Sequence, residues 1–393
     1  MVAQPPHPDA RRGGRGRGRS LRCAASHQPG RAFGCGGYGY RRSRRVRGLL
    51  LRCPSHLRPY DPRSRSGEPA AQRKQRRCGP SGEDGGVKTT PSATGVGAPR
   101  RETTGAVVAA YRPDAGFADR LGRIQCQVAR VIVVDNSGPS DRAIGHQLAG
   151  TDVEVVENER NLGVATALNQ GLRRASELEL SWAVLLDQDS VVDMDALRRL
   201  AVIYDEYPAP EKIGLLAANA RSLASGKLAV LGRRSRAGYF EVETTITSGS
   251  VLALAAYRSS GPFRDDFFIE GVDLEYCLRL RRHGFRILCS RDALMTHAGG
   301  QGLERSFLGR TVVVGDHEPW RYYYMLRNFV EIVRLYFCRE PLWVLRATTN
   351  FVKTFIKIGL YERHKSAKFA AIARGVGDGI AGSWRGRAGG FRC

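Results

Sequence analysis

From residue 105 onward, short apolar runs alternate with segments whose apolar residues recur every three or four positions. The apolar runs lie at 105–111, 130–138, 152–158, 182–190 and 212–218. The segments with helical spacing lie at 114–127, 162–175 and 195–207. Buried β-branched strands that alternate with amphipathic helices favour a doubly wound, mainly parallel sheet. The sequence therefore predicts an α/β fold.

Polar side chains follow two of these predicted strands at the point where each strand ends. Asp135 and Asn136 follow the second run, and Asp187 and Asp189 flank Gln188 at the end of the fourth. Ligands of such sheets bind beyond the carboxyl ends of the strands. On an extended strand, residues i and i+2 face the same way, so both carboxylates of the pair are expected to face one ion. Such hard oxygen ligands suit Mg²⁺ or Mn²⁺ bridging a diphosphate, and a solvated acidic turn is the alternative.

The segment from Asn161 to Gly171 opens a predicted helix with small residues along one side. Asn161 is a good N-cap, and Gly163 allows close approach to the backbone. Asn169 lies further along the same helix. The segment suits a nucleotide packed against the helix, and simple capping of the helix is the alternative.

Seven motifs then occur in a recognisable order. They are VVAAYRP (107–113), VIVVDNSG (131–138), NLGVATALNQG (161–171), LLDQDS (185–190), TSGS (247–250), FFIEGVDLEYCLRLRRHG (267–284) and THAGG (296–300). This ordered set resembles the inverting glycosyltransferases of family 2. The Asp-Gln-Asp form and the run RYYYMLRN (321–328) resemble the bacterial rhamnosyltransferase branch most. The resemblance spans residues 105–340.

The resemblance implies a GT-A fold, which is a Rossmann-like doubly wound mixed sheet, and a nucleoside-diphosphate sugar donor. It implies that Asp135 meets the nucleobase and that Asp187 approaches the ribose or the metal. It places the nucleotide sugar on Asp135, Asn136, Asn161, Gly163, Asn169 and Asp187. It implies a divalent ion, Mg²⁺ or Mn²⁺, with Asp189 as its main ligand and His297 completing a site shared with Asp187.

Inversion requires a carboxylate that deprotonates the acceptor hydroxyl while this hydroxyl attacks the anomeric carbon. The motif FFIEGVDLEY offers Glu270 and Asp273 for this role. Many family members carry Glu-Asp where this chain has Glu270 and Gly271. The base is therefore expected to be Asp273 or Glu270, with Asp273 first. A place in the first helical turn, which stabilises an anion, is the structural alternative for Asp273.

Four further residues are expected near the acceptor or a phosphate. Ser248 and Gly249 belong to a run of small residues that suits the wall of an acceptor cleft, with a plain turn as the alternative. Arg279 follows the acidic motif and could neutralise a diphosphate or lipid phosphate, with a solvated basic face as the alternative. Arg327 lies in the RYYYMLRN run and is also expected near the acceptor or a phosphate.

Two amphipathic helices are predicted near the C-terminus, within 319–375. The first carries an apolar stripe from Met325 to Phe337. On the second, a mostly basic face is set opposite an apolar one. The basic face comprises Arg346, Asn350, Lys353 and Lys357, and the apolar face Trp343, Phe351, Phe355 and Ile358. A basic helix with aromatic residues suits an anionic membrane surface, and packing on the catalytic domain or on a second copy is the alternative. Residues 376–393 are expected to fray.

Residues 1–102 differ sharply from the rest. Of the 62 Lys and Arg residues in this 393-residue chain, 22 lie in the first hundred positions, against 5 acidic residues. This segment is rich in Arg, Gly, Pro and Ser and poor in large apolar side chains, so a disordered tail is expected. A start codon set too early would also explain its composition. RNA binding through the Arg/Gly tracts is the non-enzymatic alternative, but no nucleic acid partner is expected.

The chain is thus expected to be a metal-dependent hexosyltransferase with its GT-A domain at 103–318. The resemblance implies transfer of L-rhamnose from dTDP-rhamnose to a lipid-linked glycan or cell-surface polysaccharide precursor, in the biosynthesis of cell-wall polysaccharide. UDP-galactofuranose and UDP-glucose are the alternative donors. No apolar run of about 18 residues is present, which disfavours a membrane-spanning helix. The expected location is the cytoplasm, or peripherally the inner face of the plasma membrane, and a homo-oligomer is an open alternative.

Overall fold

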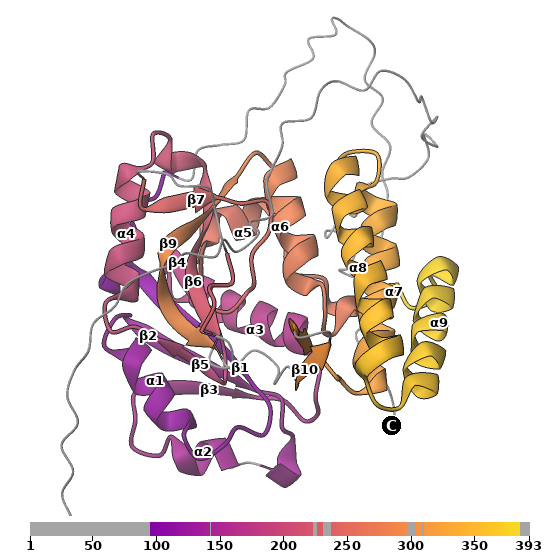
Figure 1. Ribbon diagram of the computed structural model, residues 1–393. Helices are drawn as coiled ribbons and strands as arrows, with labels where there is room; N and C mark the ends of the chain where they lie inside the picture. The colour runs from indigo at the N-terminus through magenta and orange to yellow at the C-terminus, as the bar shows by residue number, and fades with distance from the viewer. Residues whose placement is uncertain are drawn as a thin grey trace, which may run out of the picture. The chain divides into compact units, whose positions relative to one another are not determined.

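The computed structural model describes residues 95–141, 143–222, 226–230, 237–297, 303–307 and 310–385 (Figure 1). They belong to one compact unit within 54–393. Residues 1–94 lie outside the described residues. The expected disordered tail and the alternative of RNA binding through it fall in this part of the chain. The described part begins before the expected boundary at 103, because Trp182 Nε1 donates a hydrogen bond to the carbonyl of Gly97 at 2.9 Å and Ala98 is buried.

One sheet of nine strands forms the centre of the fold. Its strands are β1 (Thr104–Ala110), β2 (Arg130–Asp135), β3 (Val153–Glu157), β4 (Trp182–Asp187), β5 (Ser190–Val192), β6 (Ile213–Ser222), β7 (Tyr239–Glu241), β8 (Ser250–Ala253) and β9 (Arg286–His297). Their order is β3-β2-β1-β4-β8-β6-β9-β5, and β7 pairs with β9. Each of the five predicted strands is present, with ends no more than four residues from the expected ones.

The sheet is mixed: the five predicted strands run parallel, and the strands that periodicity did not indicate add antiparallel pairs. Strands β3, β2, β1 and β4 are parallel, as are β6 and β9. Strand β8 is antiparallel to both β4 and β6, and β5 and β7 are antiparallel to β9. The reason is that β8 follows a loop rather than a crossover helix, and the apolar run VLALAAY divides between β8 and the helix after it. The mixed, Rossmann-like sheet implied by the resemblance is confirmed.

Helices cover both faces of the sheet (Figure 1). They are α1 (Phe117–Gln125), α2 (Ala143–Gln147), α3 (Val164–Glu177), α4 (Ala196–Glu206), α5 (Leu254–Ser260) and α6 (Val272–Arg282). Gly171 of α3 packs directly on Val107 of β1. Val184 of β4 faces the other way, toward Ile124 of α1 and Leu200 of α4. Since side chains alternate along strands, α3 and the pair α1 and α4 lie on opposite faces.

Three long helices follow a two-stranded hairpin of β10 (Leu303–Phe307) and β11 (Arg310–Val314). They are α7 (Pro319–Tyr336), α8 (Pro341–Tyr361) and α9 (Lys365–Ala381). Ile332 and Tyr336 of α7 belong to the main core, so this helix is packed on the domain of the central sheet. The expectation of a frayed segment from 376 is wrong up to Ala381, where α9 ends, and Trp384 beyond it is buried.

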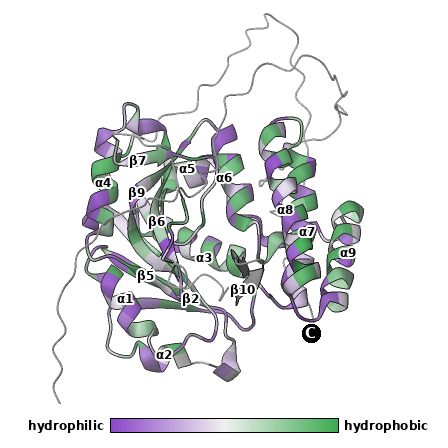
Figure 2. Cartoon of the chain, in the orientation of Figure 1, coloured by the Kyte–Doolittle hydropathy of each residue, from purple (hydrophilic) through white to green (hydrophobic). Residues whose placement is uncertain are grey.

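The short one-turn segments complete the described chain. They are η1 (Arg101–Thr103), η2 (Pro139–Asp141), η3 (Pro210–Lys212) and η4 (Asp265–Phe267). Figure 2 shows apolar residues concentrated on the strands of the sheet and on the helix faces that cover it. Among the residues that the structure describes, no helix combines the length and the apolar character needed to span a bilayer.

Candidate functional site

A cavity of about 570 Å³ lies at the carboxyl ends of β1, β2 and β4. Its lining residues are Ala109, Ala110, Tyr111, Asn136, Asn161, Gly163, Val164, Asp187, Gln188, Phe268, Ile269, Trp320 and Tyr324. The structure thus brings together four of the residues expected at the nucleotide sugar, namely Asn136, Asn161, Gly163 and Asp187. A cavity of this size at the strand ends suits a small-molecule ligand.

Asp187 and Asp189 do not share a continuous strand, which corrects the expected geometry. Strand β4 ends at Asp187, Gln188 and Asp189 form a turn, and β5 begins at Ser190. The turn is needed because β4 pairs with β1 and β8, whereas β5 pairs with β9. The alternation rule for extended strands therefore does not apply to this pair.

Gln188 fixes the shape of this turn. Its side-chain oxygen accepts a hydrogen bond from the backbone N–H of Tyr111 at 2.6 Å. Its backbone carbonyl accepts one from Nε of Arg120 at 2.8 Å. These two bonds tie the acidic turn to the ends of β1 and α1, and so hold Asp187 at the cavity wall.

Asn136 holds the loop that leads into α3. Its amide nitrogen donates to the carbonyl of Gly163 at 3.1 Å, and its oxygen accepts from Asn158 at 2.8 Å. Asn161 lines the cavity, and its side-chain oxygen accepts a hydrogen bond from the N–H of Gly163 at 2.9 Å. Asn161 therefore shapes the loop before the helix, while Gly163 occupies the N-cap position.

Asp135 lies behind the cavity wall rather than in it. It is 2% exposed, and one carboxylate oxygen accepts a hydrogen bond from the N–H of Ser137 at 2.7 Å. The neighbouring Asn136 lines the cavity. A contact between Asp135 and a nucleobase therefore stays a prediction.

The expected metal ligands lie near one another in the fold. In the register of β5 and β9, His297 pairs with Ser190, the residue after Asp189. The position of the His297 side chain is outside what the structure describes. Among the described residues, no group of three His, Cys, Asp or Glu side chains forms a ready metal cluster. The role of Asp187, Asp189 and His297 as ligands stays a prediction.

The loop that carries Glu270 and leads into the helix of Asp273 is strained and closely packed. Phe268, Glu270 and Gly271 all have positive φ, of 62°, 63° and 73°. The carbonyl of Phe268 accepts a hydrogen bond from the N–H of Val164 at 2.7 Å. A Cβ atom on Gly163 would lie 2.5 Å from this carbonyl oxygen and from the Phe268 ring. Only a glycine at 163 therefore lets this loop rest on the start of α3.

Glu270 and Asp273 differ in their partners. The Glu270 carboxylate accepts a hydrogen bond from Nε of Arg321 at 2.7 Å and a shorter one from the Nη2 of the same guanidinium. Asp273 lies in the first turn of α6, and its carboxylate accepts the N–H of Leu274 at 2.8 Å. Glu270 is thus held in an ion pair, whereas Asp273 forms no ion pair with a cation among the described residues.

Burial raises the pKa of Asp273 to about 6, and the negative charges of Glu270 and Asp187 add to this rise. Asp273 also lines a second cavity of about 190 Å³, together with Thr244, Thr245 and Ile246. A carboxyl group with such a pKa is suited to accept a proton near neutral pH.

Helix α7 braces the acidic loop from outside, which the sequence did not reveal. Asn328 is fully buried, and its amide nitrogen donates to the carbonyls of Phe267, Ile269 and Glu270 at 3.0, 2.8 and 2.7 Å. The neighbouring Arg327 donates to the carbonyl of Asp266 at 2.6 Å. The signal for this brace in the sequence is the run RYYYMLRN. Its resemblance to the rhamnosyltransferase branch does not indicate which loop its side chains contact.

Arg327 is not brought to the cavity. It is 5% exposed, and its guanidinium stacks 4.2 Å from the ring centroid of Trp384 and 4.7 Å from that of Tyr324. Its donors are directed to the loop carbonyls and to Asn328. The expectation that Arg327 meets an acceptor or phosphate is therefore not supported, because its donors are used within the protein.

Asn169 is likewise removed from the nucleotide. It is 1% exposed, and its nitrogen donates to the carbonyl of Phe263 and to Asp265, both at 2.8 Å. Its oxygen accepts from the N–H of Phe263 at 2.9 Å and from the hydroxyl of Tyr257 at 3.2 Å. The side chain is saturated by these bonds, so the expectation of a nucleotide contact is corrected to a structural role.

Ser248 and Gly249 lie beneath the acidic turn rather than in an open acceptor cleft. Ser248 is 1% exposed, its oxygen accepts the N–H of Asp187 at 3.1 Å, and it bonds with the hydroxyl of Ser190. Gly249 has φ of 76° and packs against Met295. Their small size serves close packing between β4, β6 and β9, and this corrects the expected acceptor role.

Arg279 is also directed inward. Its guanidinium pairs with Glu275 at 2.8 Å and donates to the carbonyls of Ser260 and Pro262 at 3.1 and 2.7 Å. Tyr336 of α7 donates to the same Glu275 carboxylate at 2.9 Å. These bonds join α6 to α5 and α7, so a phosphate contact by Arg279 is not supported.

The outer wall of the large cavity is aromatic and was not predicted. Phe268 stacks on Tyr324 with ring centroids 5.1 Å apart, and Trp320 meets the edge of Tyr324 at 6.3 Å. Trp320 is 40% exposed at the start of α7. The recurrence of aromatic residues in 320–324 was visible in the sequence, but nothing there placed them opposite the ends of β1 and β4.

The comparisons with known proteins agree with this geometry. Residues 121–210, from α1 to the acidic turn and α4, match the model of "Glycosyl transferase family 2". The chain is 27% identical over 291 residues to the dTDP-rhamnosyl transferase RfbF of Shigella flexneri, covering 70% of this chain and 96% of that protein. It is 26% identical over 200 residues to the poly-β-1,6-N-acetyl-D-glucosamine synthase of Staphylococcus aureus, covering 46% of each chain.

Among solved structures, the fragment 1–349 of Staphylococcus aureus TarS in complex with UDP-GlcNAc has a TM-score of 0.45 and 15% identity. That match covers 71% of this chain and 80% of the other. The family model and the long relative carry the assignment: residues 121–210 match a family 2 glycosyltransferase domain. The chain is accordingly a glycosyltransferase.

Proposed function

We propose that the chain is an inverting, metal-dependent transferase that moves L-rhamnose from dTDP-rhamnose to a hydroxyl of a lipid-linked glycan or cell-wall polysaccharide precursor. The observation that carries the proposal is that the protein combines two features: a cavity at the strand ends lined by Asp187, and the carboxyl group of Asp273, whose pKa is raised to about 6. The cavity suits the activated donor, and the Asp273 carboxylate suits the removal of a proton from the acceptor.

The nucleotide is proposed to lie in the large cavity along Asn136, Asn161 and Gly163. The aromatic side chains of Trp320 and Tyr324 form the opposite wall and offer an apolar face to a sugar or a base. Asp187 lines this cavity, and Asp189 belongs to the same turn at the end of β4. Carboxylate oxygens at this position are hard ligands, whose chemistry fits a divalent ion.

Asp187, Asp189 and His297 would hold that ion, which when bound would neutralise the charge of the diphosphate. Mg²⁺ and Mn²⁺ are the ions that suit carboxylate oxygens with open positions. The protein itself supplies the position of these ligands through the turn fixed by Gln188 and Ser248.

Asp273 is the proposed general base. Its carboxylate accepts the proton of the acceptor hydroxyl while the oxygen forms a bond to the anomeric carbon. The bond from that carbon to the diphosphate breaks on the opposite face, and its electron pair leaves with dTDP. The products are an inverted glycoside, dTDP and a protonated Asp273. Glu270 is the less suitable base because Arg321 already holds its carboxylate in an ion pair.

The second cavity gives the acceptor a place on the Asp273 side. It is lined by Thr244, Thr245 and Ile246 besides Asp273, so hydroxyl donors and an apolar surface surround the proposed base. A sugar acceptor needs both kinds of contact. The acceptor is proposed to approach from this side, while the donor fills the large cavity.

A panel of nucleotide sugars tests the donor. We expect dTDP-rhamnose with Mn²⁺ to raise the unfolding temperature more than UDP-glucose, UDP-galactofuranose or UDP-GlcNAc does, because binding to the folded state stabilises it. The support for rhamnose is the relative from Shigella flexneri, of which 96% is matched. A larger shift with a UDP sugar would overturn the proposed donor and leave the glycosyltransferase assignment in place.

A further inference from the structure

Helix α8 exposes a stripe of large apolar side chains that no described element covers. Leu342, Leu345, Val352, Ile356 and Leu360 are exposed by 65%, 64%, 50%, 56% and 57%. At 100° per residue, these five positions fall within about 80° of one another around the helix. Figure 1 shows α8 beside α7, outside the layers of the sheet.

This stripe is not the apolar face that the sequence indicated. Trp343 and Ile358 of that predicted face are buried, and Phe351 packs on Phe329 of α7 with ring centroids 4.1 Å apart. The predicted face thus holds α8 against α7. The exposed stripe is a second apolar face, so α8 has more apolar surface than its packing within this chain requires.

Basic residues border one side of the stripe. On the helical wheel Lys353 and Lys357 lie about 20° and 60° beyond Leu342 and Leu360. Arg346 lies between them on the wheel, and its guanidinium forms an ion pair with Glu243. The helix Pro341–Tyr361 contains no Asp or Glu. Figure 2 shows green and purple side by side on α8. A helix with an apolar stripe edged by cations and free of acids is typical of an element lying on an anionic membrane surface.

The stripe continues onto the next helix. Phe369 of α9 is 40% exposed, and its ring lies 4.0 Å from where a Cβ atom on Gly359 would be. Gly359 follows Ile356 by one helical turn, so the ring extends the stripe at its C-terminal end. The apolar surface therefore reaches beyond a single helix.

We propose that this surface, Leu342 to Leu360 of α8 with Phe369, docks on the headgroup and acyl boundary of an anionic lipid bilayer. A second copy of the chain fits less well, because its α8 would bring cations and no carboxylates to Lys353 and Lys357. The first hundred residues fit less well for the same reason, since they hold 22 basic and 5 acidic residues.

Helix α7 connects the stripe to the large cavity. On one side of α7 the hydroxyl of Tyr322 donates to Glu362, directly after α8, at 2.8 Å. On another side Trp320 and Tyr324 line the large cavity. The surface that we propose to dock is therefore carried by the helix that packs on the cavity wall. The proposal does not depend on which donor sugar is used.

Flotation of the full chain with lipid vesicles tests the proposal. We expect it to float with vesicles of phosphatidylcholine containing about 30% phosphatidylglycerol and to bind pure phosphatidylcholine at least tenfold less. The double variant Leu345→Ser, Ile356→Ser should lose about tenfold or more of this binding, because each change removes apolar surface from the interface. These side chains are exposed, so folding should be preserved.

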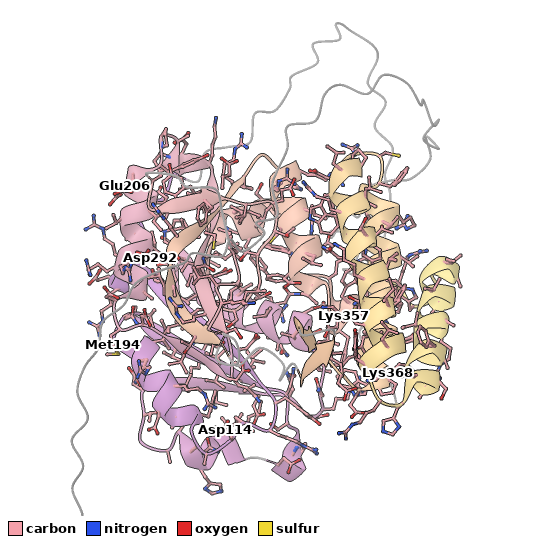
Figure 3. All side chains as sticks on the ribbon, viewed as in Figure 1. Asp114, Met194, Glu206, Asp292, Lys357 and Lys368 are labelled. Atoms are coloured by element: carbon pink, nitrogen blue, oxygen red, sulfur yellow. The ribbon has the colours of Figure 1, made fainter. Side chains whose placement is uncertain are left out.

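The matched control is the double variant Met194→Ser, Val202→Ser. Met194 precedes α4 and Val202 lies within it, and their side chains are exposed by 59% and 46%. Figure 3 shows Met194 on the opposite side of the molecule from Lys357. The control should float like the wild type. If the α8 double variant also floats like the wild type, the basic N-terminal segment carries the binding and the proposal is wrong. A wild type that fails to float overturns it too.

Sedimentation equilibrium without lipid tests whether a second copy of the chain covers the stripe instead. A wild type that is dimeric and an α8 double variant that is monomeric would show a self-interface and contradict the proposal. Transfer to a water-soluble acceptor, measured on the same variants, reads the proposed function independently. Flotation without transfer would remove the proposed function and leave the membrane surface in place.

Discussion

The carbonyl oxygen of Phe268 accepts a hydrogen bond from the N–H of Val164 at 2.7 Å. This one bond joins the loop that carries Glu270 and leads into α6 to the start of the helix that borders the large cavity. A direct backbone contact between segments about a hundred residues apart in sequence therefore holds the two candidate bases near this cavity. Gly163, at φ of 88°, is the residue that makes the contact sterically feasible.

Gly163→Ala is expected to abolish most transfer and to destabilise the fold by about 2–4 kcal/mol, because a Cβ there would collide with the Phe268 backbone and φ is positive. Chemical denaturation and initial rates measure the two effects. The control is Gly122→Ala in α1, where a Cβ meets nothing within 4 Å. That variant should be neutral or slightly more stable. Equal stability and activity of the two variants would refute the packing argument.

Asp273→Asn is expected to lower kcat by about a hundredfold or more while donor affinity changes little, as loss of a general base does. Glu270→Gln should retain more activity, because Arg321 occupies its carboxylate. Asp273→Asn should also raise stability at neutral pH, by up to ~3 kcal/mol for a shift of about two pKa units. Rates and denaturation curves for both variants decide this. If Glu270→Gln loses turnover and Asp273→Asn keeps it, the roles are reversed.

The pH dependence has a defined sign. The pKa of Asp273 is raised from 3.8 to about 6, so the carboxylate form needed for proton removal gains population as the pH rises through about 6. We expect kcat/KM to rise through this region and then level off. The destabilisation caused by the ionised group is present above about 6 and fades as the pH falls toward 4. The residual activity of Asp273→Asn should lack this rise of kcat/KM near pH 6. If the rise persists in that variant, a group other than Asp273 causes it.

Much of the fold followed from periodicity alone. The β-branched runs became β1 to β4 and β6 because strands buried on both faces need continuous apolar sequence. The antiparallel placement of β8 did not follow, since VLALAAY fits either direction and only its neighbours decide. The turn at Gln188 was likewise hidden, because a strand that passes from one pairing to another leaves no mark in an apolar run.

The site was predictable where backbone position decides and not where side-chain direction decides. Asn136, Asn161, Gly163 and Asp187 line the cavity as expected because they follow strand ends or open a helix. Asn169 is a polar residue on a suitable helix, but its side chain faces the interior. Short-range spacing does not state which partners a polar group finds a hundred residues away.

The brace from α7 gives a fourth prediction. Asn328→Ala removes the donor for three buried carbonyls in the acidic loop, so we expect a loss of about 2–4 kcal/mol and a marked fall in kcat. Asn350→Ala, at an exposed position of α8, is the matched control and should change stability by less than about 0.5 kcal/mol. Thermal unfolding and turnover measure both variants. Unchanged turnover in a stably folded Asn328→Ala would show that the loop does not need this brace.

The central claim is that the acidic turn after β4 holds the activated donor through a divalent ion. Calorimetric titration of dTDP-rhamnose in Mg²⁺ into wild type, Asp187→Asn and Asp189→Ala tests it most directly, with Asp195→Asn before α4 as the control. We expect the wild type and Asp195→Asn to bind alike, and both acidic-turn variants to bind at least about tenfold more weakly, with chelation of the metal weakening the wild type equally. Unchanged affinity in Asp187→Asn and Asp189→Ala, or no effect of chelation, would contradict the account.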